Sequence, residues 1–142
     1  TWRGRAELNR NWLTRNTSDG LIALSGAAFG DIGHALMQAD TKRAMALANG
    51  WNHDFPDAFY IELQRAERDF DEPYNAAAMN LASVCDLPVV ATHPIQFMAP
   101  DDFKAHEARV CIARGEVLGD KRRTRDFTPA QYFKSRWRTA AS

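Results

Sequence analysis

The sequence predicts an α/β fold in which parallel strands alternate with helices, arranged as a partial (β/α) barrel. Three short apolar runs lack polar alternation, which is typical of strands buried on both faces of a sheet. A segment with helical spacing of apolar residues follows each run, and this is the pattern of parallel βαβ units. A barrel of this kind needs about eight strands to close. Three strands therefore predict an incomplete fragment of a larger domain.

The three predicted strands are bounded by turn residues. The first covers residues 21–25 (LIALS) and lies between a Ser-Asp-Gly turn and a glycine. The second covers residues 58–63 (AFYIEL), which are rich in aromatic and β-branched side chains. The third covers residues 88–92 (PVVAT) and carries no charge. We expect helices to cover both sides of all three.

Four helices are predicted from caps and apolar stripes. A short helix covers residues 31–37, and Asp40 is the predicted N-cap of the next helix. A third helix begins at Asp71, with a proline inside its first turn and one apolar stripe along its length. The fourth begins at residues 100–102, where Pro-Asp-Asp places acidic side chains in the first turn.

The end of the chain is predicted to form a final helix. Thr128 and Gln131 have the spacing of a capping box, and Pro129 occupies the first helical position. We expect this helix to dock through apolar side chains that include Phe133. The 142 residues are interpreted as a single segment, 1–142, with three parts: a lead-in helix and turn at about 1–20, βα units at 21–115, and a basic loop with the final helix at 116–142.

The net charge of zero conceals an uneven distribution. Residues 1–20 carry four arginines against two acids, residues 113–142 carry eight bases against three acids, and the centre carries six bases against thirteen acids. An acidic centre argues against a domain that wraps nucleic acid on its main face. No apolar run reaches membrane-spanning length, no secretory leader opens the chain, and Cys85 and Cys111 indicate reduced core thiols. We therefore expect a cytoplasmic protein without a membrane partner.

Two residues at the ends of predicted strands are candidates for chemistry. His93 follows the third strand and Glu62 ends the second, and α/β folds place active-site groups at the carboxyl ends of parallel strands. Either side chain there is suited to a general base or a metal ligand. The structural alternatives are a turn histidine with a backbone partner, and a salt bridge from Glu62 to Arg65 or Arg68. No phosphate-binding loop, serine elbow or zinc-spaced histidine pair occurs in the sequence.

Several stretches together resemble the polymerase-and-histidinol-phosphatase (PHP) family, in the form found at the N-terminus of bacterial replicative polymerases. They are DGLIALSG at residues 19–26, FYIELQR at 59–65, LPVVAT at 87–92, DDFKAHEARV at 101–110 and YFKS at 132–135. The resemblance runs from about residue 12 to residue 138. It implies that the chain is the C-terminal half of a PHP domain, whose fold is a distorted α/β barrel of seven strands, about twice this length.

The resemblance also implies which residues of this chain correspond to metal ligands of the family. Metal-binding members place a cysteine after the Leu-Ser-Gly strand and an Asp-x-His pair after the Ala-Thr strand. Those positions correspond to Ala27, Pro94 and Gln96, which offer no lone-pair donor or only a weak one. We therefore expect no metal, no cofactor and no catalytic residue in this segment, with His93 and Glu62 as weak candidates only. Mg²⁺ is expected in the parent's polymerase site, outside this chain.

Three functions remain open at this point. The leading interpretation is a non-catalytic PHP segment that acts as a scaffold in DNA replication, in contact with the remainder of the polymerase subunit and with a proofreading exonuclease subunit. The second is a phosphoesterase, 3′–5′ exonuclease or pyrophosphatase that needs the missing N-terminal half. The third is a DNA- or subunit-binding module using Lys121–Arg125 and Arg136–Arg138, with DNA contact weak or indirect. Open strand edges also predict self-association of the isolated fragment.

Overall fold

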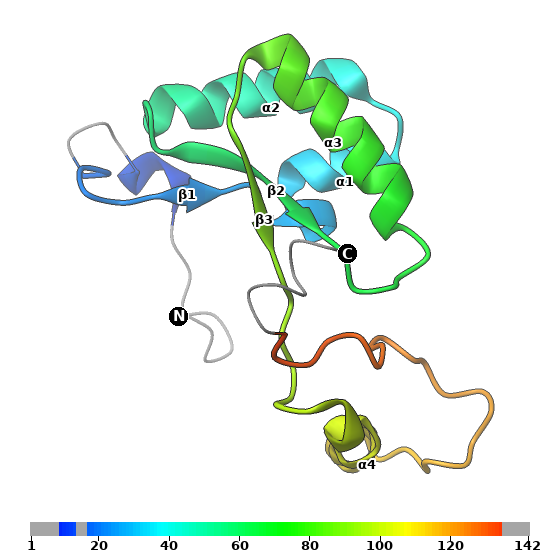
Figure 1. Ribbon diagram of the computed structural model, residues 1–142. Helices are drawn as coiled ribbons and strands as arrows, with labels where there is room; N and C mark the ends of the chain where they lie inside the picture. Colours follow the sequence, from blue (N-terminus) through cyan, green and yellow to red (C-terminus); the bar gives the residue numbers. More distant parts are fainter. Residues whose placement is uncertain (1–8, 14–16, 135–142) are drawn as a thin grey trace. The chain divides into compact units, whose positions relative to one another are not determined.

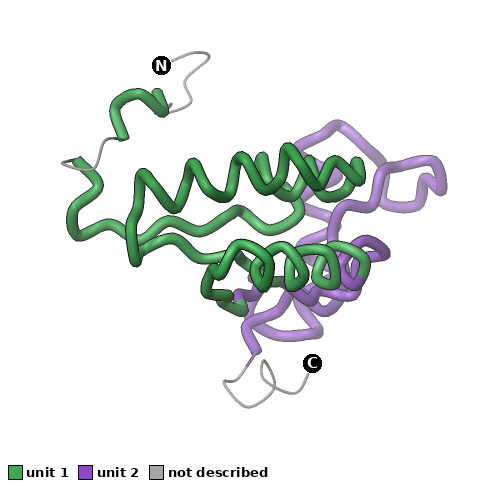
Figure 2. The backbone as a smooth tube through the Cα atoms, turned by 90° about the horizontal axis from the view of Figure 1, so that it is seen from above, with its two compact units in different colours: residues 1–63, 73–91 green, residues 64–72, 92–142 purple. Residues whose placement is uncertain are grey.

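The computed structural model describes residues 9–13 and 17–134, which fall into two compact units. Unit 1 contains residues 1–63 and 73–91, and unit 2 contains residues 64–72 and 92–142 (Figure 2). Within the described ranges, no helix has the length and apolar character needed to cross a bilayer. In chain order the elements are η1 (Arg10–Trp12), β1 (Ala23–Leu24), η2 (Ala27–Phe29), α1 (Asp31–Met37), α2 (Thr41–Asp54), β2 (Phe59–Gln64), α3 (Asp71–Cys85), β3 (Val89–Thr92), η3 (Pro100–Asp102) and α4 (Phe103–Arg114) (Figure 1).

The predicted alternation of strands and helices is confirmed. Helix α1 has the predicted bounds, and strands β2 and β3 lie within one residue of theirs. Helix α2 begins after the predicted cap, because Asp40 Oδ1 accepts a hydrogen bond from the backbone N–H of Arg43 at 3.0 Å. The described part of the lead-in region contains one short 3-10 turn, η1.

The strands form one parallel sheet in the order β1-β2-β3. Strand β1 pairs with β2 in a register that places Ala23 opposite Phe59 and Leu24 opposite Tyr60. Strand β3 lies on the other side of β2, where the N–H of Ile61 donates to the carbonyl of Pro88 at 2.9 Å. Three strands make an open sheet in the described part of the chain, and no closed barrel is formed there.

The core of unit 1 lies between β2 and the helices. Phe59 and Ile61 point to this side and are at most 1% exposed. They belong to one apolar cluster with α2 and with the predicted stripe of α3, which buries Tyr74, Ala78 and Leu81. Burial of this area from water is the main favourable term in holding the sheet against the helices.

The expectation that all three strands are buried on both faces is wrong. Because Leu24 is the register partner of Tyr60, it lies on the sheet face opposite Phe59 and Ile61, and it is 45% exposed. On the edge strand β3, Val89 is 43% exposed. The helices of unit 1 bury the face that carries Phe59 and Ile61. The second face of the sheet is therefore uncovered at Leu24, although Glu62, which follows Tyr60 on the same face, is only 8% exposed.

The turn between β1 and α1 depends on two glycines. A Cβ atom at Gly30 would lie 1.8 Å from the carbonyl oxygen of Ser25, and a Cβ at Gly33 would lie 2.1 Å from that of Ala27. Both contacts are with backbone and cannot be relieved by a side-chain rotation. Only glycine therefore allows α1 to pack this closely against the end of β1.

Unit 2 is built around α4 and the extended segments that flank it. The helix buries His106, Glu107 and Cys111. The His106 ring packs 5.5 Å from Phe97 and makes an edge-on contact of 4.7 Å with Phe127. His106 is thus a packing residue, and its contacts give unit 2 a small aromatic core.

The predicted final helix is not formed at residues 129–134, and residues 135–142 lie outside the described part of the chain. The Gln131 side chain does accept from the N–H of Thr128 at 2.9 Å, as a capping box requires. The Thr128 hydroxyl, however, donates to the carbonyl of Ala66. The following residues pair with residues 96–97, through Phe133 N to Phe97 O at 3.0 Å and a parallel bridge from Phe97 to Tyr132. Long-range pairing therefore replaces the helix by a turn and an extended segment.

Candidate functional site

Ala27 lies in unit 1, at the start of η2, with 1% of its surface exposed. Its methyl group is part of the apolar cluster under the sheet. Its φ of 48° falls in the left-handed region, which only a few per cent of non-glycine residues adopt. The position at which the resemblance implied a cysteine ligand is thus occupied by a buried methyl group that completes the core.

Glu62 is also in unit 1, near the end of β2, and is 8% exposed. Its backbone is held at both ends, because its N–H donates to Ser25 Oγ and its carbonyl accepts from the Tyr74 hydroxyl, each at 2.9 Å. Burial raises the pKa of Tyr74, with the nearby Glu62 charge acting in the same direction and the Ser25 hydrogen bond opposing it. The phenol therefore stays protonated and serves as a structural donor.

His93 lies in unit 2 and is half-buried. Its Nε2 is 2.9 Å from the carbonyl oxygen of Ala130, so Nε2 carries the proton and donates. The two neighbouring candidate positions bind the same segment. Gln131 Nε2 donates to the carbonyl of Pro94 at 3.1 Å, and the Gln96 N–H donates to the carbonyl of Gln131 at 2.8 Å. Residues 93–96 are therefore hydrogen-bonded to residues 130–131, and His93 has the backbone partner that the turn-histidine alternative describes.

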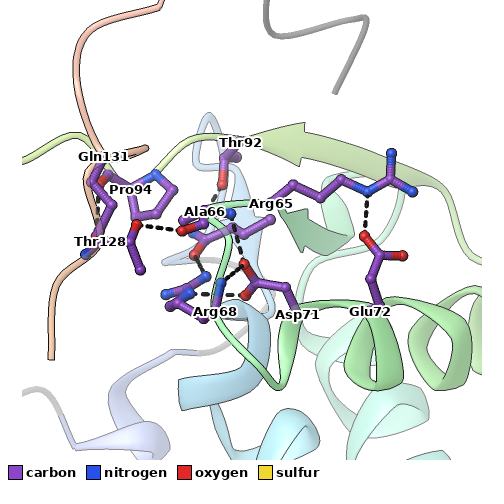
Figure 3. Close-up of polar contacts among 10 residues, drawn as sticks. Arg65, Ala66, Arg68, Asp71, Glu72, Thr92, Pro94, Thr128 and Gln131 are labelled. Atoms are coloured by element: carbon purple, nitrogen blue, oxygen red, sulfur yellow. Dashed lines mark hydrogen bonds and ion pairs between the residues drawn. The ribbon is translucent and has the colours of Figure 1, made fainter. Parts of the chain in front are cut away.

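A polar cluster that the sequence did not reveal follows β2 (Figure 3). At its centre, Asp71 Oδ1 binds Arg68 Nε at 2.8 Å and Asp71 Oδ2 accepts from the N–H of Ala66 at 2.6 Å. Arg68 also donates to Gln64 Oε1 at 3.0 Å, and Gln64 Nε2 donates to Thr92 Oγ1 at 3.0 Å. Arg68 and Asp71 are three residues apart, and an aspartate at this spacing commonly binds backbone N–H groups of the preceding loop. This local spacing is the sequence signal that could have revealed the cluster.

Arg65 and Arg68, the two arginines considered as partners of Glu62, each form an ion pair with another carboxylate. Arg65 Nε pairs with Glu72 Oε1 at 2.9 Å, and Arg68 pairs with Asp71. The first pair is exposed, whereas the second has side chains only 8% and 5% exposed. The groups of this cluster are engaged with one another, which makes it a structural clamp on the loop.

The predicted basic run does not form a uniform cationic surface. Arg123 turns inward and forms a buried ion pair with Glu107 of α4, while Arg122 is exposed and pairs with Asp120. Lys121 and Arg125 are exposed. Arg136–Arg138 lie outside the described residues. The five-residue run is therefore divided between a buried anchor and separate surface charges.

The contacts of the candidate residues described above are with other groups of the same fold. Across residues 9–13 and 17–134, no group of three or more His, Cys, Asp or Glu side chains is placed to hold a metal ion. The positions that the PHP resemblance assigns to ligands, Ala27, Pro94 and Gln96, carry a buried methyl, a proline ring and a neutral amide, which do not fit a transition metal.

Comparison with known proteins gives the context of this segment. Residues 1–66 match the family model described as "PHP domain". DNA polymerase III subunit alpha of Neisseria meningitidis serogroup A is 54% identical over 129 residues, which are 90% of this chain and 11% of that protein. The subunit of that name from Pseudomonas aeruginosa is 46% identical over 93% of this chain, and the one from Escherichia coli K12 is 39% identical over 90%. The resemblance to the PHP region of DNA polymerase III alpha subunits is confirmed.

The PHP family model ends at residue 66, whereas the similarity to the alpha subunits continues over about nine tenths of the chain. The chain spans only 11% of the length of these relatives. The PHP match thus includes β1, α1, α2 and β2, and it ends within the polar cluster, between Ala66 and Arg68.

Proposed function

We propose that this chain is a non-catalytic, metal-free segment of the PHP region of a replicative DNA polymerase, with a scaffold role in DNA replication. One observation carries the proposal. The three positions that the family uses for ligands hold Ala27, Pro94 and Gln96, and the Ala27 methyl is buried in the core of unit 1. A catalytic transition metal needs three or four donors converging at about 2.0–2.3 Å. These side chains supply at most one weak donor.

The hydrogen bonds of the candidate residues support a scaffold role. His93 binds the Ala130 carbonyl, and the backbone of Glu62 is fixed by Ser25 and Tyr74. A general base needs a free nitrogen or oxygen within reach of its substrate. The bond from Nε2 of His93 to the Ala130 carbonyl fixes the ring on the segment at residues 130–131, which supports a positioning role and leaves Nδ1 as the only ring nitrogen with a lone pair.

The partner in this proposal is the remainder of the polymerase alpha subunit. Two observations support it: the relatives are about nine times longer than the matched segment, and the sheet of unit 1 has an uncovered face. Contact with a proofreading exonuclease subunit is a further part of the proposal and rests on the PHP resemblance. Polymerase chemistry with Mg²⁺ would belong to parts of the subunit outside this chain.

The proposal is tested by elemental analysis of the purified chain after dialysis. We expect no stoichiometric zinc, manganese or iron. An Ala27→Cys variant should also stay metal-free, because Pro94 and Gln96 are unchanged. About one tightly held transition metal per chain, lost in a His93→Ala variant and retained in a matched His53→Ala variant, would overturn the proposal.

A hydrolysis assay tests the same proposal independently. We expect no cleavage of bis(p-nitrophenyl) phosphate, pyrophosphate or a 3′-terminal nucleotide, with and without added Mn²⁺. Activity that co-purifies with the chain and disappears in both His93→Ala and Glu62→Gln would instead support the phosphoesterase alternative.

A further inference from the structure

Unit 2 contains a pocket of about 470 Å³ that none of the functions above uses. It is lined by residues of α4, by the loop after β2 and by the segment from Leu118 to Pro129. Small-molecule sites are typically a few hundred cubic ångströms in volume and mostly apolar, with a few polar groups. The apolar part of this lining consists of Phe103, Leu118, Phe127 and Pro129.

The two aromatic walls are held in place by their neighbours. Phe103 packs against Phe97 with ring centroids 5.8 Å apart, and Phe127 makes its edge-on contact with the buried His106. Ring contacts of this kind fix the orientation of a side chain. The walls are therefore preformed and would not need to be ordered when a ligand binds.

The charged part of the lining is predominantly cationic. Arg123 and Glu107 line the pocket and neutralise each other, with side chains only 6% and 7% exposed. Nη1 of Arg123 is buried and has no hydrogen-bond acceptor in the described part of the chain. Lys104 and Arg125 are exposed and have no ion-pair partner among the described residues. The lining therefore contains two cations without an ion-pair partner, Lys104 and Arg125, and the unused Nη1 donor of Arg123. Glu67 is the exposed acid of the lining.

We propose that this pocket binds a phosphomonoester with a flat aromatic body, of which a nucleoside monophosphate is the simplest example. A phosphomonoester carries a charge of about −1.5 to −2 at pH 7 and three acceptor oxygens, so it can contact Lys104 and Arg125 at the same time while the exposed Glu67 stays in water. Its oxygens are strong acceptors for guanidinium and ammonium donors. The aromatic body would lie against Phe103 and Phe127.

The experiment is a calorimetric titration of the complete 142-residue chain with dAMP. We expect saturable binding of one dAMP per chain. Binding should be at least about tenfold weaker for deoxyadenosine, which lacks the charged acceptor group, and for inorganic phosphate, which lacks the aromatic body. Lys104→Ala and Arg125→Ala should each weaken dAMP binding about tenfold. Arg122→Ala is the matched control, because Arg122 is 91% exposed and does not line the pocket.

Several results would overturn the proposal. One is equal binding of dAMP and deoxyadenosine, which would mean that the phosphate is not recognised. Another is the same loss of affinity in Arg122→Ala as in Arg125→Ala. A third is the absence of saturable dAMP binding at millimolar concentration while circular dichroism shows folded variants. Binding of an oligothymidylate strand that dAMP does not displace would assign the two cations to a DNA strand instead.

Discussion

Asp71 determines the conformation of the loop between β2 and α3. Its carboxylate accepts hydrogen bonds from the N–H groups of Ala66 and Arg68 and from the Arg68 guanidinium, and the residue is only 4% exposed (Figure 3). A buried charge is tolerated when it is paired and its remaining lone pairs are satisfied. Here one carboxylate satisfies three donors of the same short loop.

Replacing Asp71 by Asn should therefore destabilise the chain strongly. The change leaves the Arg68 guanidinium buried without its counter-ion, and breaking a buried pair in this way costs about 3–5 kcal/mol. Glu72→Gln is the adjacent control, since its pair with Arg65 is exposed and should contribute less than about 1 kcal/mol. Urea denaturation of the two variants measures the difference. Equal losses would show that the loop does not depend on Asp71.

His106 makes the stability depend on pH. Burial and then the nearby Arg109 cation lower the pKa of His106, while Glu107 acts in the opposite direction. The folded state therefore binds fewer protons than the unfolded state below the usual histidine pKa of about 6.5, so stability falls as the pH falls through this range. We expect the urea midpoint to decrease between pH 7 and pH 5.

A His106→Phe variant should flatten this pH profile, because an aromatic ring can still pack against Phe97 and Phe127 without gaining a proton. His53→Phe, at an exposed position, should leave the profile as it is in the parent chain. An unchanged slope in His106→Phe would assign the pH dependence to other groups.

At the scale of elements, the capping-box residues at 128–131 form a turn that is bonded to a distant segment and do not begin a helix. The Gln131 side chain bridges the N–H of Thr128 and the carbonyl of Pro94, and Gln131 is 3% exposed. Phe133, which was expected to anchor a helix, is 57% exposed. The stabilising contact of this segment is therefore a buried amide.

Gln131→Ala should accordingly cost about 2 kcal/mol, because it leaves the N–H of Thr128 and the carbonyl of Pro94, both in half-buried residues, without their side-chain partner. Phe133→Ala should cost less than about 1 kcal/mol, as is usual for exposed sites. Thermal unfolding followed by circular dichroism distinguishes the two variants. A larger loss for Phe133→Ala would mean that its ring is covered in solution.

The elements that could be predicted from the sequence are those formed by interactions between residues close together in the chain. The Asp40 cap of α2 and the apolar stripe of α3 are local signals, and both were confirmed. The final helix failed because the Thr128 hydroxyl bonds to Ala66, 62 residues earlier in the chain. The basic run was likewise divided by a pairing of Arg123 with a residue of α4. The contacts of the candidate site residues depend on side-chain partners that are far apart in the sequence. Such pairings cannot be predicted from the periodicity of a single sequence.

At the scale of the whole molecule, the sheet of unit 1 is the feature that requires a partner. The uncovered face carries Leu24, and the edge strand β3 exposes Val89. Free strand edges and exposed apolar side chains promote pairing with another chain. In the proposed parent subunit the remaining polypeptide would cover them.

The isolated chain should therefore self-associate at micromolar concentration, as measured by light scattering. Leu24→Lys should weaken this association by placing a charge on the uncovered face. Met79→Lys is the control, because Met79 is similarly exposed but lies on α3. A monomeric parent chain with a sharp, cooperative unfolding transition would contradict this expectation.

The covalent order of the two units limits how this chain can be divided. The polypeptide leaves unit 1 after residue 63, returns at residue 73 and leaves again after residue 91, so unit 2 is assembled from two separate stretches. A chain shortened to residues 1–91 would keep Gln64 and Ala66 but lose Thr92 and Thr128, to which they are hydrogen-bonded. No single cut releases either unit with its hydrogen bonds intact. Expression of one unit alone therefore requires a circular permutation or a replacement for residues 64–72.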